Sequence, residues 1–257
     1  MYKSQTNVSS RGEEDMKLKD KVAIVTGGGR GIGRAIALGY AKEGADLVLI
    51  SRTKSEIEAV ADEIRSFGRY AISIVTDISE ESDVNNMVEE AYAYYKHVDV
   101  LVNNAGILDK DLFEIKDLEL SRWNKIIGIN LTGTFLCSRA VIRKMISQNR
   151  GCIINISSGL GKRGRAGYNA YSASKSGVDR LTEILADECR KYNIAVNSLE
   201  PGGATKTRML ERTDPARAPK GGILSPERMV PPAIFLATQD SNSLTGTFIV
   251  ANEWNAK

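Results

Sequence analysis

The sequence contains little of what several common kinds of site require. Its 257 residues include one histidine and three cysteines, and Cys137, Cys152 and Cys189 lack the spacing of metal ligands. We therefore expect reduced thiols in a reducing compartment, with no metal site and no disulfide. The histidine, His97, follows Lys96 near an expected helix end, where a surface or capping role is favoured. A Ser-His-Asp hydrolase is thereby disfavoured.

Long apolar runs and a large charge of one sign are also missing. Lys and Arg exceed Asp and Glu by three (35 against 32), and they are scattered along the chain, which argues against a nucleic-acid surface. We find no window of roughly 20 apolar residues, which a membrane span would need. The first 15 residues lack the apolar core of a signal peptide. These features predict a cytoplasmic protein with no nucleic-acid or membrane partner.

The order of the apolar segments predicts the fold. Residues 1–15 are polar and aperiodic, so we expect a flexible tail ahead of a catalytic domain at residues 16–257. The expected strands, which alternate with helical stretches, are residues 22–25, 46–50, 71–75, 98–102, 152–156, 194–199 and 247–250. This βαβ pattern predicts an α/β fold, a single-domain Rossmann-type, doubly wound parallel sheet with helices on both faces. Residues 202–226, rich in Gly, Pro and charge, are expected to form a mobile substrate-side loop.

A glycine-rich turn follows the first expected strand directly and leads into a helical stretch at residues 34–43. Glycine permits a tight turn, lets backbone N–H groups approach a pyrophosphate and brings the helix close to the strand. A purely structural turn is the alternative, but the strand before it and the helix after it favour dinucleotide binding. The residues of this turn expected to contact the cofactor are Gly27, Gly29, Arg30, Gly31, Ile32 and Gly33.

The end of the second strand distinguishes NAD from NADP. An NAD site usually places a carboxylate there for the ribose 2′-hydroxyl. This chain has Ser51 and Arg52 instead, with no carboxylate between Asp46 and Glu56. Arg52, together with Arg30, could bind a 2′-phosphate through charge-assisted hydrogen bonds. Two solvated surface arginines are the alternative, and the missing acid favours NADP(H).

Two further strand ends carry residues suited to the cofactor. Asp77 could bond the adenine amino group, and Asn side chains can tie neighbouring strand ends together. For Asn103 this structural role is favoured. The cofactor residues expected at these two strand ends are Asp77, Ile78, Asn104, Ala105 and Gly106.

Tyr171 and Lys175 are four residues apart and share one face if their stretch is helical. Tyr92 and Lys96 repeat the spacing. However, Tyr92 falls near the end of a helix that starts around residue 79, which places it roughly 20 Å from the carboxyl edge of the sheet. Tyr171 lies near the start of its helix and beside Ser158, so the chemistry is assigned to Tyr171.

The expected chemistry is acid-base catalysis by a phenol. An isolated phenol has a pKa of about 10, so a neighbouring cation, Lys175, is expected to favour the phenolate. In reduction Tyr171 would donate a proton to a carbonyl oxygen that Ser158 holds, and in oxidation the roles reverse. Asn130 lies in an apolar helical stretch, where it could anchor a water leading to Lys175 or bond locally to the helix backbone.

Together these motifs resemble those of the short-chain dehydrogenase/reductase family. The likeness covers about residues 19–250 and is greatest to the compact branch that contains 3-oxoacyl-[acyl-carrier-protein] reductases and broad carbonyl reductases. It implies a Rossmann-type subunit, usually a homotetramer, in which residues 120–148 and 173–192 are candidate subunit contacts. Tyr171 and Lys175 would also touch the cofactor. The resemblance rests on residues 26–33, 103–106, Asn130, Ser158, Tyr171, Lys175, Pro201 and Gly202. It implies that Asn130, Ser158, Tyr171 and Lys175 form the catalytic group, with Pro201, Gly202, Ala204 and Thr205 near the nicotinamide.

The sequence departs from the family pattern on the substrate side. Lys206 stands where the family usually has threonine, so either Thr205 or Thr207 could meet the nicotinamide. The following segment is shorter than in acyl-carrier-protein reductases, and the chain lacks the Asp-Gly-Gly that the family often carries near its end. Both differences argue against fatty-acid elongation. Lys162, with its basic neighbours, could meet an anionic substrate or form a solvated loop.

The expected function is therefore an NADP-dependent oxidoreductase acting on a small carbonyl or alcohol substrate, with a ketone or aldehyde reductase favoured. A 3-oxoacyl-thioester reductase and a sugar or polyol dehydrogenase are alternatives. A non-catalytic NADP-sensing protein is disfavoured by the intact Asn-Ser-Tyr-Lys group. A P-loop hydrolase is excluded because Gly33-Arg34 stands where Gly-Lys-Ser/Thr is required.

Overall fold

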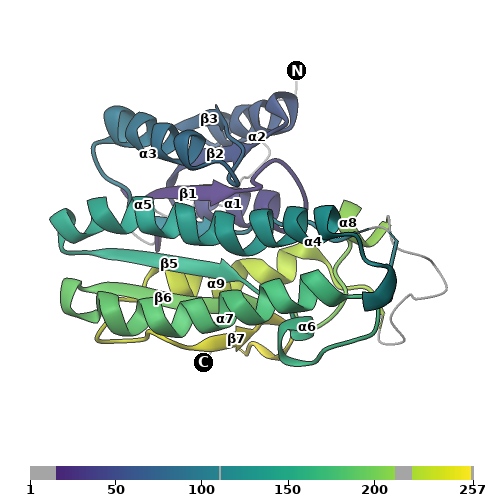
Figure 1. Ribbon diagram of the computed structural model, residues 1–257. Coiled ribbons are helices and arrows are strands. Elements are labelled where there is room, and N and C mark those ends of the chain that lie inside the picture. Colours follow the sequence, from purple (N-terminus) through teal and green to yellow (C-terminus); the bar gives the residue numbers. More distant parts are fainter. Residues whose placement is uncertain (1–15, 110, 212–221, 256–257) are drawn as a thin grey trace, which may run out of the picture.

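The computed structural model describes residues 16–109, 111–211 and 222–255. The expected N-terminal tail and residues 212–221 of the expected loop lie outside the described residues. Within the described part, one sheet of seven parallel strands has the order β3-β2-β1-β4-β5-β6-β7 (Figure 1). The strands are β1 (Val22–Thr26), β2 (Asp46–Ser51), β3 (Ala71–Val75), β4 (Val100–Asn103), β5 (Gly151–Ile156), β6 (Ile194–Glu200) and β7 (Phe248–Val250).

Each strand lies within two residues of its predicted position, because these buried apolar runs are flanked by polar turns. β1 lies inside the sheet and pairs with a strand on each side. β1 pairs with β2 through Val22 and Asp46 and with β4 through Ala23 and Val100. The gap between the two halves is the topological switch point, where open α/β sheets bind their ligands. The predicted doubly wound Rossmann-type fold is confirmed.

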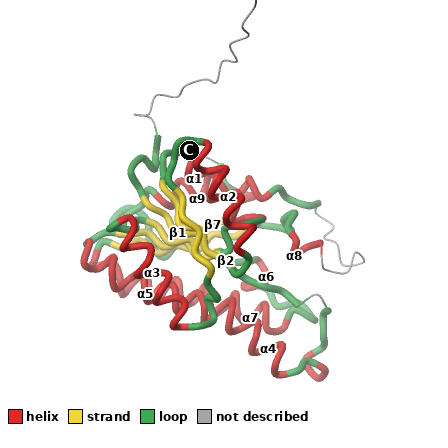
Figure 2. Tube along the Cα trace, turned by 90° about the horizontal axis from the view of Figure 1, so that it is seen from above, coloured by secondary structure: helices red, strands yellow, loops and turns green. Residues whose placement is uncertain are grey.

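Helices cover both faces of the sheet, and each face has its own apolar core. On one face α1, α2 and α9 contribute residues such as Ile36 and Ile57, and on the other α3, α5 and α7 contribute residues such as Met87 and Val141 (Figure 2). The helices are α1 (Gly31–Lys42), α2 (Lys54–Ser66), α3 (Glu81–Tyr95), α4 (Leu120–Ile127), α5 (Gly133–Gln148), α6 (Gly159–Lys162), α7 (Asn169–Cys189), α8 (Arg208–Glu211) and α9 (Val230–Ala237).

α4 and α5 form one continuous helical stretch, joined by a π-helical turn at Gly128–Thr132. Among the described residues, this stretch, Leu120–Gln148, is the one helix long and apolar enough to cross a membrane, with a mean hydropathy of 1.2 over its most apolar window. However, 56% of that window is buried inside the fold. Core helices of soluble proteins pass the same test, so the evidence for a membrane span is weak.

Candidate active site

The glycine turn forms a cradle at the carboxyl end of β1. Gly27 has a φ of 64°, which L-residues with side chains rarely adopt. A Cβ on Gly33 would lie 2.3 Å from the Gly27 carbonyl oxygen and 2.5 Å from Asn104 Nδ2, so only glycine fits there. The residue before α1, Arg30, makes no side-chain capping bond to the helix, because its guanidinium carries only donors and cannot accept from the N–H groups. The backbone N–H groups at the start of α1 therefore remain available, and the cradle fits a dinucleotide pyrophosphate.

Both arginines expected near the ribose lie beside carboxylates. Arg30 Nη1 donates to Glu56 Oε1 at 3.0 Å, and Arg52 Nη1 lies 3.4 Å from Asp77 Oδ2. Glu56 lies 26 residues from Arg30, so no local sequence pattern places it at the glycine turn. The Ser51 hydroxyl is engaged locally by the Thr53 amide at 2.9 Å. The same hydroxyl lies 3.2 Å from the Thr53 carbonyl oxygen, so in the described part of the chain Ser51 bonds to the backbone of Thr53 and not to a carboxylate.

Asparagine side chains join the strand ends. Asn104 Nδ2 donates to the carbonyl oxygens of Thr26 and Gly27 at 2.9 and 3.2 Å, which fastens β4 to β1 across the switch point. Asn103 Nδ2 donates to Asn155 Oδ1 at 2.9 Å, and Asn155 Nδ2 donates onward to Thr182 Oγ1 of α7 at 2.9 Å. The expected structural role of Asn103 is confirmed by these buried bonds.

Ser158, Tyr171 and Lys175 meet at the same edge of the sheet. Ser158 lies two residues beyond β5 and accepts a hydrogen bond from the Leu160 amide at 3.3 Å, which caps α6. Tyr171 lies in the first turn of α7 and Lys175 one turn later. Lys175 Nζ donates to the Ile156 carbonyl oxygen at 2.7 Å and lies 5.9 Å from the centroid of the Tyr171 ring.

Asn130 lies in the π-helical turn and is fully buried. Its Oδ1 accepts from the Ile107 amide at 2.8 Å, while its Nδ2 donates to the Ile107 carbonyl and to Ser174 Oγ. The side chain therefore does not bond locally to its own helix, and its expected role toward a water near Lys175 stays a prediction. The side chain instead fixes the segment after β4 to α7. A Cβ on Gly106 would lie 3.3 Å from Asn130 Oδ1 and 3.8 Å from Lys175 Nζ, so these three residues adjoin.

Burial changes both catalytic pKa values. Desolvation raises the pKa of Tyr171 above its ordinary value, a hydrogen bond with Ser158 opposes the rise, and Tyr168 adds to it. Desolvation lowers the pKa of Lys175 to about 8, and the Asp179 carboxylate partly opposes this. The expected lowering of the tyrosine pKa by Lys175 is not found here, because the cost of burying a phenolate outweighs the stabilising contacts.

Tyr171 belongs to a small apolar cluster at the start of α7. Tyr171, Tyr168, Ile126 and Ala170 form a small buried cluster. Partly buried side chains pack against this cluster, and we call them the apolar collar: Ile107, Leu108, Leu112, Trp123, Leu160 and Met209. Met209 comes from α8, so the segment after β6 reaches the cluster that contains Tyr171.

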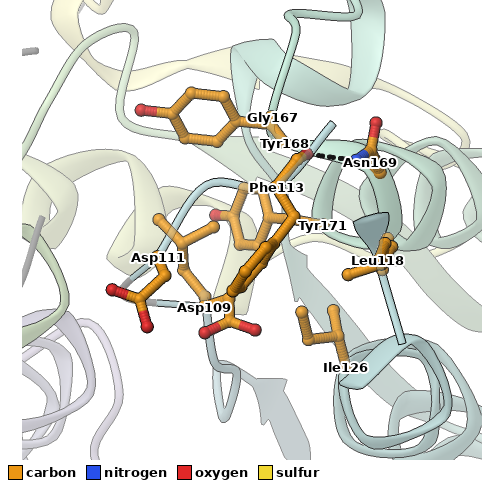
Figure 3. A pocket seen from close by; sticks show the side chains of 11 residues that line it. Asp109, Asp111, Phe113, Leu118, Ile126, Gly167, Tyr168, Asn169 and Tyr171 are labelled. Carbon is orange, nitrogen blue, oxygen red and sulfur yellow. Dashed lines mark hydrogen bonds between the residues drawn. The ribbon is translucent and has the colours of Figure 1, made fainter. Parts of the chain in front are cut away.

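A small cavity lies beside the Tyr171 ring, between the segment after β4 and the start of α7 (Figure 3). Its volume of about 10 Å³ admits at most about one water, so protein packs the ring on this side. Arg122 of α4 holds the segment through 2.9 Å bonds to both Asp109 carboxylate oxygens. Asn169 Nδ2 donates to the Phe113 carbonyl oxygen at 2.7 Å. These bonds fix the position from which Tyr171 can act.

The two threonines after β6 have different surroundings, and which of them would meet the nicotinamide stays a prediction. The Thr207 methyl group lies 3.2 Å from the position of a Cβ on Gly31, at the start of α1. Thr205 is buried and pairs with Leu224 in an isolated parallel bridge. Part of the expected loop is therefore ordered by this bridge and by α8. Thr207 is the threonine that lies beside the pyrophosphate cradle.

Sequence reasoning missed Glu200, the last residue of β6. Its carboxylate is 9% exposed, and Oε1 accepts from Lys162 Nζ of α6 at 3.1 Å. Lys162 therefore forms an ion pair within the protein, whereas the sequence suggested either a solvated loop or a contact with an anionic substrate. The pair fastens α6, which follows Ser158, to the end of β6, directly before Pro201. A charged residue inside an apolar strand pattern was the only sequence signal.

The second Tyr-x-x-x-Lys pair lies away from the site. Tyr92 is near the end of α3, and Lys96 follows that helix with a φ of 67° and donates to the Ala93 carbonyl oxygen. His97 lies 3.3 Å from Asp99 and is half-exposed. These contacts agree with the structural roles expected for Tyr92 and His97.

Comparison with known proteins identifies the family. A family model described as short chain dehydrogenase matches residues 21–218, and the chain belongs to the short-chain dehydrogenase/reductase family. It is 36% identical over 245 residues to a 3-oxoacyl-[acyl-carrier-protein] reductase of Aquifex aeolicus, covering 93% of this chain and 98% of the relative.

Solved structures of related enzymes share the fold. One is a putative NAD(P)-dependent gluconate 5-dehydrogenase from Beutenbergia cavernae with bound NADP, with 38% identity, a TM-score of 0.81 and coverage of 91% of this chain and 96% of that one. Another is an NAD⁺-bound xylitol dehydrogenase, with 29% identity, a TM-score of 0.83 and coverage of 91% and 98%. The chain is accordingly an oxidoreductase of the CH–OH/C=O class that binds a nicotinamide dinucleotide.

Proposed function

We propose that this protein is an NADP-dependent carbonyl reductase for small ketones or aldehydes. The observation that carries the proposal is the apolar collar around Tyr171, which includes Leu108, Leu160 and Met209. Such a surface favours substrates that bury hydrocarbon and disfavours polyhydroxylated sugars, whose hydroxyl groups would lose hydrogen bonds to water. A 3-oxoacyl thioester also carries hydrocarbon, and the likeness to the Aquifex aeolicus reductase makes it the second candidate.

In the proposed reaction NADPH supplies the hydride. Tyr171 Oη gives its proton to the carbonyl oxygen, and the Ser158 hydroxyl holds that oxygen. Lys175, one turn along α7, places a positive charge near Tyr171 as the phenol loses its proton. We assign Asn130 the positioning of the segment after β4, through its bonds to Ile107. The raised pKa of Tyr171 keeps the phenol protonated at neutral pH, which supports reduction as the working direction.

The proposed preference for NADP rests on the end of β2. Arg52 follows the strand, Arg30 lies in the glycine turn, and no carboxylate contacts Ser51 in the described part of the chain. Relatives with NADP and with NAD⁺ are both known, so the choice depends on these residues. We also propose that the other residues of the glycine turn, Pro201 to Thr207 and the two later strand ends complete the cofactor site.

We propose a cytoplasmic homotetramer with no nucleic-acid or membrane partner. The three cysteines are buried and free, as expected in a reducing compartment. Long helices expose apolar side chains that a subunit interface would cover: Phe135 on α5 is 39% exposed and Ile184 on α7 is 48% exposed. Two kinds of isologous contact would generate D₂ symmetry. The division into a tail at residues 1–15 and one catalytic domain remains part of this proposal.

The decisive experiment is a substrate panel followed by NADPH absorbance. It compares small ketones and aldehydes, a 3-oxoacyl thioester, and keto sugars with the corresponding polyols, each with NADPH and NADH. We expect the highest kcat/KM for an apolar ketone or aldehyde with NADPH. Because losing charge-assisted bonds to one phosphate typically costs over about 1.4 kcal/mol, NADPH should be preferred at least about tenfold. A best substrate among the sugars, or a preference for NADH, would contradict the proposal.

A further inference from the structure

Glu56 joins two arginines that come from distant parts of the chain. Its Oε1 accepts from Arg30 Nη1 at 3.0 Å and from Arg208 Nη1 at 3.2 Å. Arg30 belongs to the glycine turn, whereas Arg208 begins α8 and lies 152 residues from Glu56 in sequence. The contact therefore connects the segment after β6 to the first turn of α2, beside the phosphate cradle.

The position of Glu56 is fixed by close packing. A Cβ on Gly29 would lie 2.8 Å from Glu56 Cβ and 3.1 Å from its carbonyl carbon, so the first turn of α2 rests directly on the glycine turn. The Glu56 side chain is 27% exposed, and the side chains of Arg30 and Arg208 are 52% and 50% exposed. The acid is therefore held in place, while both guanidinium groups can still reorient toward a ligand.

Both arginines line a cleft of about 650 Å³ beside the start of α1. Its described lining is positively charged, with four cations against two acids: Arg30, Arg34, Lys206, Arg208, Glu211 and Glu227. Thr207 of the same lining meets Gly31 at the pyrophosphate cradle. Two guanidinium groups that share one carboxylate oxygen are only partly satisfied, because each carries several donors in a planar fork. A phosphate monoester, with three acceptor oxygens, suits this pair better.

We propose that Arg208 is a further ligand of the 2′-phosphate of NADP(H), and that Glu56 sets the affinity for this phosphate. Glu56 holds Arg30 and Arg208 together, and a bound 2′-phosphate takes over their hydrogen bonds. Exposed ion pairs contribute little to stability, so this exchange of partners is easy. The Glu56 carboxylate then remains as a like charge close to the phosphate and weakens its binding. The inference rests on the proposed NADP dependence.

Isothermal titration calorimetry on the full-length protein separates the phosphates without depending on turnover. The ligands are NADPH, NADH, 2′,5′-ADP, which carries the 2′-phosphate without the pyrophosphate, and 5′-ADP, which carries the pyrophosphate alone. The variants are Glu56→Gln, which keeps an acceptor and removes the charge, and Arg208→Ala. Glu58→Gln is the matched control, because side chains two positions apart on α2 do not share a face. Circular dichroism confirms that each variant is folded.

We expect Glu56→Gln to tighten NADPH and 2′,5′-ADP binding by about three- to tenfold and to change NADH and ADP binding by less than about twofold. Arg208→Ala should weaken NADPH and 2′,5′-ADP by a similar factor of about three to ten. Glu58→Gln should leave all four affinities unchanged.

Two results would overturn the inference while leaving NADP dependence intact. If Arg208→Ala weakens 5′-ADP binding and leaves 2′,5′-ADP binding unchanged, Arg208 serves the pyrophosphate instead, and equal weakening of both would place it on the adenosine 5′-phosphate that they share. If Glu56→Gln leaves NADPH binding unchanged or weakens it, the carboxylate does not oppose the phosphate. By contrast, wild-type protein that binds NADH as tightly as NADPH would refute the proposed cofactor preference itself, and the roles of Arg208 and Glu56 would fall with it.

Discussion

Replacing Lys175 by methionine should stabilise the protein at neutral pH, although it removes a group that we propose takes part in catalysis. Lys175 is 5% exposed, and burial lowers its pKa from 10.5 to about 8. The folded protein therefore binds this proton more weakly than the unfolded chain does. The cost to stability is fully present below pH 8 and is relieved as the pH rises from 8 to 10.5. At about 1.4 kcal/mol for each pKa unit, it is about 3 kcal/mol at pH 7 and about 1 kcal/mol at pH 9.5.

The variant also loses the hydrogen bond from Lys175 Nζ to the Ile156 carbonyl oxygen, which contributes about 1–2 kcal/mol at either pH. We therefore expect Lys175→Met to be more stable than the wild type by about 1–2 kcal/mol at pH 7 and no more stable at pH 9.5. The diagnostic quantity is the change of about 2 kcal/mol in the stability difference between variant and wild type from pH 7 to pH 9.5. The lost hydrogen bond does not affect this change, because it contributes equally at both pH values.

Urea denaturation followed by circular dichroism at pH 7 and 9.5 measures this quantity, with the protein concentration held constant because assembly affects apparent stability. Lys191→Met is the control, since Lys191 is exposed and lies just beyond α7. Its stability should follow that of the wild type at both pH values. If the difference in free energy of unfolding between Lys175→Met and the wild type is the same at pH 7 and pH 9.5, the ammonium is not desolvated and the reasoning is wrong.

Four other outcomes are expected. Tyr171→Phe should lower kcat by roughly 10² or more with little change in NADPH affinity, whereas Tyr92→Phe should have little effect, and equal losses would refute the assignment to Tyr171. Asn155→Ala should destabilise the protein by about 2–4 kcal/mol in urea, because it strips buried partners from Asn103 and Thr182; an unchanged midpoint would refute this. Light scattering should give about 112 kDa, four times 28.0 kDa, and a fully active monomer would contradict the tetramer. Alcohol oxidation should have a higher pH optimum than carbonyl reduction, because Tyr171 must lose its proton first; coincident optima would show otherwise.

Most of the fold was predictable because its signals are local. The apolar runs at Val22–Thr26 and Asp46–Ser51 identify buried parallel strands without knowledge of their partners. The glycines of the first turn have a local cause as well, since Gly27 needs a positive φ and Gly33 must pass the Gly27 carbonyl oxygen. Tyr171 could be preferred over Tyr92 because distance along a helix converts directly into position relative to the sheet edge.

The contacts that the sequence did not reveal join residues far apart in the chain. Glu56 meets Arg208 across 152 positions, and Asn130 meets Ile107 across 23. Neither pair has a sequence pattern, because each depends on how segments distant in the chain pack together around the finished sheet. The π-helical turn at Gly128–Thr132 is another such case. It has the composition of an ordinary apolar helix, and π-helical turns commonly occur at functional sites.

The two catalytic pKa shifts have opposite signs and one cause. Burial disfavours the charged form of each group, so Tyr171 keeps its proton more firmly and Lys175 releases its proton more readily than in water. A site that reduces a carbonyl needs the pKa of the phenol to lie above that of the ammonium. The phenol must be protonated when substrate arrives, and it must regain a proton after each turnover. Lys175 lies one helical turn away, and its pKa of about 8 is close enough to neutral pH for it to supply that proton. The same burial therefore serves catalysis at both residues, and the ammonium bears the cost in stability that the methionine variant would remove.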